Sequence, residues 1–378
     1  MELMTKKDFN MFVPVNTPKF SGNEKKYLID CIDSGWISSE GPYVRKFEEN
    51  FAKFCDRKYA VAVTNGTIAI DIALKALDLP RGSEVILPSF TIISCIHEIV
   101  NSGLKPVYVD SSLETWNMDV NQIEEKITPN TSAIMAVHIY SFPVEMDKVI
   151  SLAKKYNLKI IEDAAEMHGQ TYNGNICGSF GDISTFSFYA NKHITTGEGG
   201  MILTNNKDYY EKILSLRNLC FTKEKRFYHT HLGTNARMTN IQAALGVAQL
   251  ENINAIVKRK REIGELYNNL LVKNDKFITL PSKMPYADNI YWVYGILLKD
   301  SSNMQKIIEF LNKNGVGNRP FFYPLHKQPV LKEFNNNLSL PNSEILSENG
   351  FYIPSGLGIT DKEIEYVSQK VNQILDEI

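Results

Sequence analysis

Three short runs near the middle of the chain indicate its architecture: Lys159-Ile160-Ile161-Glu162-Asp163, Ile183-Ser184-Thr185-Phe186-Ser187-Phe188 and Met201-Ile202-Leu203-Thr204. Similar β-rich runs precede them at residues 59–63, 84–87, 106–110 and 133–138. Several runs are apolar along their whole length, as expected for strands that helices cover on both faces, and the segments between them are long enough for crossover helices. The pattern predicts a large α/β domain built on a mostly parallel sheet.

The pattern changes after Asn240. A long helical pattern over residues 241–271 leads into a strand-like stretch at residues 290–298, a polar helix and a C-terminal helix. The chain of 378 residues is therefore expected to form a large domain with an N-terminal arm over residues 1–250 and a smaller α+β domain over residues 251–378.

Composition excludes several classes of protein. Lys and Arg number 41 against 43 Asp and Glu, a net charge of −2, which disfavours nucleic acid as a partner. The five cysteines form no CxxC pair, so neither a disulfide framework nor a metal cluster is expected. No stretch approaches the ~18 apolar residues of a membrane span, and the first residues lack the apolar core of a signal peptide. We expect a soluble, cytoplasmic protein without a bound metal or membrane contact.

Lys192 is the candidate catalytic residue. Between Gly174 and Gly200 the only other formally charged residues are Asp182 and Glu198. A lone lysine among apolar and small residues favours the neutral amine, which a Schiff-base nucleophile requires. A solvated surface lysine is the ordinary alternative.

A Schiff-base lysine points to pyridoxal phosphate, whose ring nitrogen needs a carboxylate partner. Asp163, at the end of a predicted strand, is the best candidate, although a helix N-cap explains it equally well. The turn Thr64-Asn65-Gly66-Thr67 runs into a helix whose N-terminus would bind the phosphate, and Ser187 would add a hydroxyl. Phe90 would stack on the ring or, alternatively, belong to the core.

These segments in this order resemble the pyridoxal phosphate-dependent nucleotide-sugar aminotransferases of the DegT/StrS type. The resemblance is carried by Glu162-Asp163-Ala164-Ala165-Glu166, by the strand at residues 183–188, and by Lys192 with Thr195-Thr196-Gly197-Glu198-Gly199-Gly200. It extends over nearly the whole chain, through Gly35-Trp36-Ile37-Ser38-Ser39, Asn235-Ala236-Arg237-Met238 and Arg319-Pro320-Phe321-Phe322-Tyr323-Pro324-Leu325-His326. It implies an aspartate aminotransferase-like fold (fold type I).

By position, the resemblance implies that Lys192 forms the Schiff base and later moves the proton between cofactor and substrate. Further cofactor contacts are implied for seven residues: Asp163 at the ring nitrogen, Glu166 near the ring hydroxyl, Phe90 on the ring face, Gly66, Thr67 and Ser187 at the phosphate, and Asn235 at the phosphate of a neighbouring subunit. Asn235 therefore implies a homodimer with shared active sites. A loop asparagine that caps the next helix is the alternative.

The resemblance also bears on the reaction. Related sugar 3-dehydratases carry histidine at the lysine position, so Lys192 favours transamination. Glu166 stands where many relatives have glutamine, which changes the charge near the ring. His168, two residues further on, is close enough for a polar contact with cofactor or substrate.

The segment at residues 319–326 resembles that of the GDP-perosamine synthases, which use L-glutamate to aminate GDP-4-keto-6-deoxymannose. It implies substrate contacts for Arg319, Tyr323 and His326, with Trp36 as a further candidate. Arg319 in a surface ion pair and the neighbouring phenylalanines in the core are the alternative. A smaller keto substrate, such as a phosphorylated three-carbon compound, and a non-catalytic regulator with the same fold also stay open.

Overall fold

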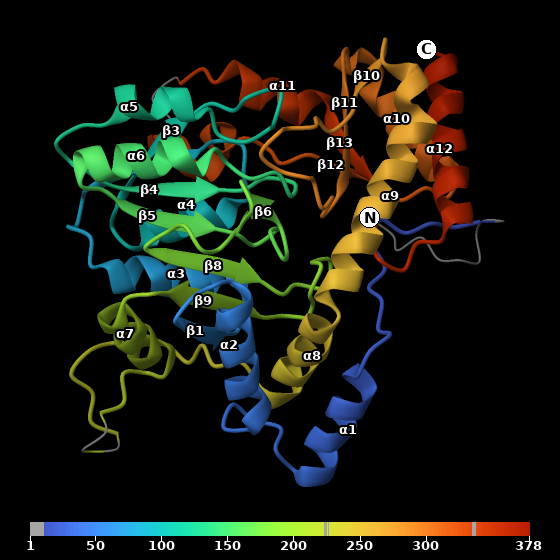
Figure 1. Cartoon of the computed structure of the whole chain (residues 1–378). Coiled ribbons are helices and arrows are strands. Elements are labelled where there is room, and N and C mark those ends of the chain that lie inside the picture. Colours follow the sequence, from blue (N-terminus) through green and yellow to red (C-terminus); the bar gives the residue numbers. More distant parts are fainter. Residues whose placement is uncertain (1–10, 223–224, 226, 335–337) are drawn as a thin grey trace.

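The computed structural model describes residues 11–222, 225, 227–334 and 338–378 (Figure 1). The prediction that no signal peptide is present concerns mainly residues 1–10, which lie outside the described residues. Within the described part, none of the helices combines the length and the apolar content that crossing a bilayer requires.

A seven-stranded sheet forms the centre of the larger part of the molecule, with the strand order β1-β9-β8-β5-β4-β2-β3. Its strands are β1 (Tyr59–Val63), β2 (Glu84–Pro88), β3 (Lys105–Val109), β4 (Thr131–Val137), β5 (Lys159–Asp163), β8 (Ile183–Ser187) and β9 (Gly200–Thr204). Strand β9 pairs antiparallel with both β1 and β8, and the other neighbours pair in parallel. The prediction of a mostly parallel α/β sheet is confirmed.

Helices cover both faces of this sheet (Figure 1). One apolar core includes side chains of α2 (Pro42–Phe54), α6 (Met146–Tyr156) and α8 (Asn240–Glu251). The other includes side chains of α3 (Gly66–Leu77), α4 (Ile93–Asn101) and α7 (Lys207–Arg217). Successive strand residues alternate between the two cores, as Ala60 and Val61 do, which explains why the strands are apolar on both faces.

A four-stranded antiparallel sheet, ordered β10-β11-β13-β12, forms the centre of the C-terminal part. Its strands are β10 (Ile278–Thr279), β11 (Tyr294–Leu298), β12 (Arg319–Pro320) and β13 (Gly350–Ile353). A third apolar core joins this sheet to α9 (Ile253–Leu271), α10 (Met304–Lys313) and α12 (Asp361–Asp376). The remaining α-helices and strands are α1 (Glu24–Ser34), α5 (Ile123–Lys126), α11 (Pro341–Asn349), β6 (Thr171–Tyr172) and β7 (Asn175–Ile176). Short 3-10 helices lie at Val120–Gln122, Val272–Asn274, Ser301–Asn303, Leu325–Lys327 and Pro329–Phe334.

Two expectations about the C-terminal half differ from the structure. The helical pattern over residues 241–271 is two helices, because the backbone at Asn252 leaves the helical region with φ −104° and ψ 8°. The strand expected from residue 290 begins only at Tyr294, since Tyr291 has a positive φ of 47° that an extended strand does not allow. The domain boundary near residue 250 stays a prediction; the first turns of α9 still pack into a core of the large sheet.

Candidate active site

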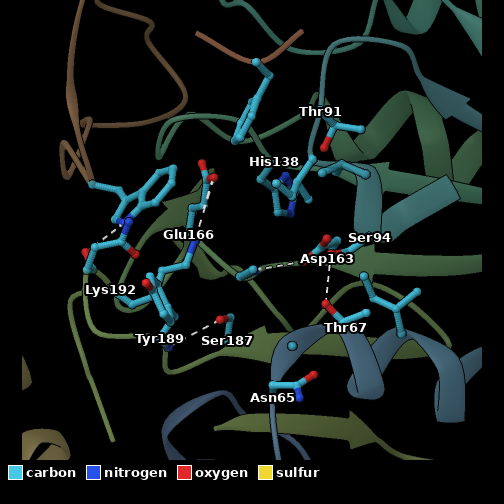
Figure 2. Close-up of a pocket in the computed structure, with 18 of the residues that line it drawn as sticks. Asn65, Thr67, Thr91, Ser94, His138, Asp163, Glu166, Ser187, Tyr189 and Lys192 are labelled. Carbon is cyan, nitrogen blue, oxygen red and sulfur yellow. Dashed lines mark hydrogen bonds and ion pairs between the residues drawn. The ribbon is translucent and has the colours of Figure 1, made fainter. Parts of the chain in front are cut away.

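A cavity of about 370 Å³ opens where the parallel strands end (Figure 2). Its walls come from the loops that follow β1, β2, β4, β5 and β8, the position at which open α/β sheets bind ligands. The C-terminal part of the chain closes one side with Trp292, Phe322 and Tyr352. Six of the predicted site residues line the cavity: Gly66, Thr67, Asp163, Glu166, Ser187 and Lys192.

Lys192 follows β8 and extends its side chain toward Glu166 (Figure 2). The distance from Nζ to Glu166 Oε1 is 3.9 Å, and Nζ lies 3.7 Å from the centre of the Trp292 ring. Burial lowers the pKa of Lys192, while the charges of Glu166 and Asp163 oppose this shift. A buried amine with a lowered pKa is the state that a nucleophilic lysine needs.

Glu166 is a second unusual titratable group. Its side chain is 7% exposed, and its carboxyl accepts the backbone N–H of Tyr140. Burial raises the pKa of Glu166 from 4.5 to about 8, against the opposing effects of Lys192 and that N–H. The carboxyl therefore holds a proton at neutral pH and can act as a hydrogen-bond donor.

Asp163 ends β5 with its carboxyl on the cavity wall. One oxygen accepts the N–H of Ala165 at 3.1 Å, and the other accepts the Cys95 thiol at 3.3 Å. Burial raises the pKa of Asp163, although the N–H, the thiol and Lys192 oppose the shift. A thiol is a weak donor, so this carboxyl retains acceptor capacity that suits a cationic ring nitrogen.

The start of α3 provides an anion site. Asn65 caps the helix by accepting the N–H of Ile68 at 2.9 Å, which leaves the N–H groups of Gly66 and Thr67 at the first turn. A Cβ atom at Gly66 would lie 2.8 Å from Ser187 Cβ, so only glycine allows this approach. The carboxyl, the anion site and the buried amine together fit the nitrogen, phosphate and carbonyl of pyridoxal phosphate.

Glu162 supports the site from behind, a role that sequence reasoning did not find. Its carboxylate accepts hydrogen bonds from His138 Nε2, the Ser184 hydroxyl and the backbone N–H groups of Gly178, Phe180 and Gly181. Burial by itself raises the pKa of Glu162, but His138 and the N–H groups outweigh it and bring the pKa to about 2. Glu162 thus anchors the loop between β7 and β8 and orients His138, which lines the cavity.

Two predicted residues lie in the core and not on the cavity wall. Phe90 is fully buried, with its ring about 6 Å from those of Tyr140 and Phe322. The cavity wall after β2 is formed instead by Thr91 and Ile92. His168 is likewise buried, stacked on Phe188 at 5.4 Å, and does not line the cavity.

Four other predicted contacts do not line the cavity within this chain. His326 is 4% exposed, and its ring nitrogens are engaged by Ser89 Oγ at 2.6 Å and Glu344 Oε1 at 3.1 Å. Trp36, Arg319 and Tyr323 are exposed. Their substrate roles stay predictions.

Asn235 also lies away from the cavity wall. It forms an isolated β-bridge with Asn218, and Arg237, two residues later, forms one with Val63 of β1. Its role at a second subunit stays a prediction.

Comparison with known proteins identifies the group of enzymes that share these features. The sequence profile of the DegT/DnrJ/EryC1/StrS aminotransferase family matches residues 18–372. GDP-perosamine synthase of Escherichia coli O157:H7 is 40% identical over 362 residues, 96% of this chain and 98% of that protein. GDP-perosamine synthase of Vibrio cholerae is 39% identical over 361 residues, 94% of this chain and 97% of that protein.

Solved structures agree with the fold. An aminotransferase from Psychrobacter cryohalolentis superposes with a TM-score of 0.89 at 29% identity, covering 97% of this chain and 100% of that one. The Helicobacter pylori aminotransferase PseC, involved in the biosynthesis of pseudoaminic acid, has a TM-score of 0.93 at 23% identity, covering 97% of this chain and 100% of that one. At this identity the second likeness shows the fold alone.

Proposed function

The chain belongs to the DegT/DnrJ/EryC1/StrS aminotransferase family and is a pyridoxal phosphate-dependent aminotransferase, and on that premise we propose its reaction. It transfers the amino group of L-glutamate to the keto carbon of a nucleotide-linked 4-keto-6-deoxy sugar. GDP-4-keto-6-deoxymannose is the proposed substrate and GDP-perosamine the product, because relatives at 39–40% identity over nearly their whole length are GDP-perosamine synthases. We place this reaction in the cytoplasm, in the synthesis of a surface polysaccharide such as O-antigen or capsule.

The observation that carries the proposal is the buried Lys192 amine facing the Glu166 carboxyl in a cavity at the strand ends. Pyridoxal phosphate, when bound, supplies a carbonyl group for the amine and an electron-withdrawing ring. Asp163 would hold the ring nitrogen. The first-turn N–H groups of α3 and the Ser187 hydroxyl would hold the phosphate.

Proton movement falls to Lys192 and Glu166. Burial lowers the pKa of Lys192 and so favours the neutral amine, whose Nζ can accept a proton from the donor's carbon and return it to the acceptor's carbon. Glu166 Oε1 is 3.9 Å from Nζ, too far for a direct hydrogen bond but close enough to bias its protonation. The Trp292 ring, whose centre lies 3.7 Å from Nζ, shields one side of the amine from water.

We infer in addition that the enzyme works as a homodimer. An apolar groove on α1 and α8 is lined chiefly by Phe20, Leu28, Ile29, Ile32 and Leu245. Ile32 is 65% exposed and Phe20 56%, and a contiguous apolar surface of this kind is typical of a subunit interface. In the dimer that we propose, Asn235 would reach the phosphate held by the neighbouring subunit; it lies five residues before α8, the helix that contributes Leu245 to the groove.

The reaction is tested with purified enzyme, pyridoxal phosphate, L-glutamate and GDP-4-keto-6-deoxymannose, with the amino sugar detected by mass spectrometry. Lys192→Ala is expected to lose both turnover and the visible absorbance of lysine-bound cofactor, while Lys258→Ala, on the exposed face of α9, keeps both. Turnover of a phosphorylated three-carbon ketone, with none of any GDP- or UDP-linked keto sugar, would assign the smaller substrate instead.

Sharing of the active site is tested by mixing Lys192→Ala and Asn235→Ala subunits. If Asn235 acts across the interface, half of the sites in a mixed dimer contain both native residues. An equal mixture that exchanges subunits at random should therefore recover about a quarter of wild-type turnover. No recovery, with exchange confirmed by tagged subunits, would show that the two residues act within one chain. Full turnover by Asn235→Ala alone would show that Asn235 is not required.

A further inference from the structure

Lys260 is a buried lysine that takes no part in the proposed reaction. It lies on α9 with 2% of its surface exposed. Its ammonium group donates to the carbonyl oxygen of Trp292 at 3.2 Å and to that of Ser355. Burial, with a smaller effect from Arg259, lowers the pKa of Lys260 to about 7. Burying an amine is costly, and an apolar side chain of this length would pack here at lower free-energy cost. The two hydrogen bonds to carbonyl oxygens are therefore the reason to look for a role of Lys260.

One of those carbonyls belongs to the residue that covers the reactive lysine. The Trp292 N–H donates to Ser141 Oγ at 2.6 Å, and its indole Nε1 donates to the carbonyl of Asn191 at 2.9 Å. Lys192 Nζ lies 3.7 Å from the centre of the indole ring. A cation at this distance from an indole face is stabilised, so the contact favours the ammonium form of Lys192.

The main chain before Trp292 is strained and depends on α9 for its path. Tyr291 has a φ of 47°, an unfavourable value for a bulky residue that persists only where the surroundings impose it. Gly264 lies one turn after Lys260 on the same face of α9, and a Cβ there would come within 2.3 Å of the Tyr291 ring. Gly264 thus leaves room for the Tyr291 ring, and Lys260 donates to the carbonyl of the next residue, Trp292.

We propose that Lys260 is a positioning residue for the reactive lysine, because its side-chain N–H groups hold the main chain at Trp292 and so keep the indole ring over Lys192 Nζ. The role rests on the proposed function of Lys192. Glu166, Asp163 and Cys95 act on Lys192 through their charges, and the hydrogen bonds of Lys260 go to other residues. His193 and His168 also interact with Lys192; burial, with smaller effects from Lys260 and Lys192, lowers the pKa of His193 to about 3, and burial lowers the pKa of His168 well below its ordinary value, so both rings are neutral during the measurement. The two ways in which Lys260 can affect Lys192 have opposite signs: loss of the indole contact lowers the pKa of Lys192, and removal of a nearby positive charge raises it.

The experiment measures the pKa of Lys192 in the full chain freed of cofactor. Reductive methylation with formaldehyde and cyanoborohydride labels the neutral amine, and mass spectrometry of the Lys192 peptide gives its rate as a function of pH. The variants are Lys260→Met, the milder Lys260→Gln, Trp292→Leu, the double variant Lys260→Met/Trp292→Leu and the exposed control Lys258→Met. Circular dichroism checks that each variant is folded.

Lys260→Met and Trp292→Leu should each lower the labelling midpoint, Trp292→Leu by about one pH unit. The double variant should shift no further than Trp292→Leu alone, because Lys260 acts through the ring. Lys260→Gln should shift the midpoint less, in the same direction, and it carries the test if Lys260→Met does not fold. An unchanged or raised midpoint in the folded Lys260 variant, or additive shifts in the double variant, would overturn the proposal. Because labelling needs no sugar turnover, this result is independent of the test of the proposed reaction.

Discussion

Gly66→Ala is the substitution that tests the phosphate site most directly. The new Cβ would lie 2.8 Å from Ser187 Cβ, and ordinary contacts begin at 3.4 Å, so the start of α3 and the end of β8 must separate by 0.6 Å (3.4 minus 2.8 Å). A hydrogen bond of about 2.9 Å that lengthens by this amount reaches the limit of hydrogen bonding. One hydrogen bond to a charged group contributes about 1.5–3 kcal/mol, so the dissociation constant for pyridoxal phosphate should rise about 10- to 150-fold.

The assay is an equilibrium titration of cofactor-free protein with pyridoxal phosphate, followed by absorbance. It is carried out in two backgrounds that both lack the Ser187 hydroxyl: Ser187→Ala retains the Cβ atom, and Ser187→Gly removes it. Gly66→Ala should weaken binding in the alanine background and have little effect in the glycine background, where Ser187 Cα at 3.4 Å is the nearest remaining atom. Equal losses in both backgrounds would refute the steric reasoning and place the effect in the helix start itself.

Three further substitutions separate structural from chemical roles. The pKa of Glu166 is about 8 in the folded protein and 4.5 in the unfolded chain, so its contribution to stability is complete below pH 4.5 and is lost as the pH rises through 8. In urea unfolding of cofactor-free protein between pH 6 and 8, wild type should therefore lose about 1.4 kcal/mol per pH unit more than Glu166→Gln. Parallel curves of unfolding free energy against pH would contradict this. Glu162→Gln should cost about 3–5 kcal/mol of unfolding free energy at pH 7, and a loss no greater than that of the exposed control Glu365→Gln would show that the carboxylate is not needed. His326→Ala should lower the melting temperature but change the KM for the sugar less than about threefold, since both ring nitrogens form hydrogen bonds within the protein. A tenfold rise in KM would support the substrate role predicted from the sequence.

The large sheet and the base of the site could be predicted because local pattern determines them. All seven strands were expected within two residues of their observed ends, since runs apolar on both faces have few other solutions in a soluble domain. Parallel strands bring their carboxyl ends to one edge, so the turn at Gly66, Asp163 and Lys192 could be expected to meet before any distance was known.

Side-chain direction and the contribution of the smaller sheet could not be predicted in this way. Phe90 and Ile92 are two residues apart after β2, and the path of the loop decides that Phe90 enters the core while Ile92 lines the cavity. Trp292 sits in an alternating stretch that is typical of a strand, yet the positive φ of Tyr291 turns it toward Lys192. Its role depends on how the C-terminal part packs against the large sheet, and sequence periodicity carries no information about that packing.

The charge of the cavity explains how a chain of net charge −2 can serve anionic ligands. Among the described residues that line it, three are acidic, Asp163, Glu166 and Glu198, and Lys192 is the one lysine or arginine. Burial raises the pKa of Glu166 to about 8 and lowers that of Lys192, so the cavity wall has no strong positive charge, and a cofactor phosphate there is held by backbone N–H groups. Those groups suffice for one phosphate, but a nucleoside diphosphate and the two carboxylates of glutamate need further cationic partners. This chain places no arginine on the described wall, which is a chemical reason for the proposed second subunit to complete the site.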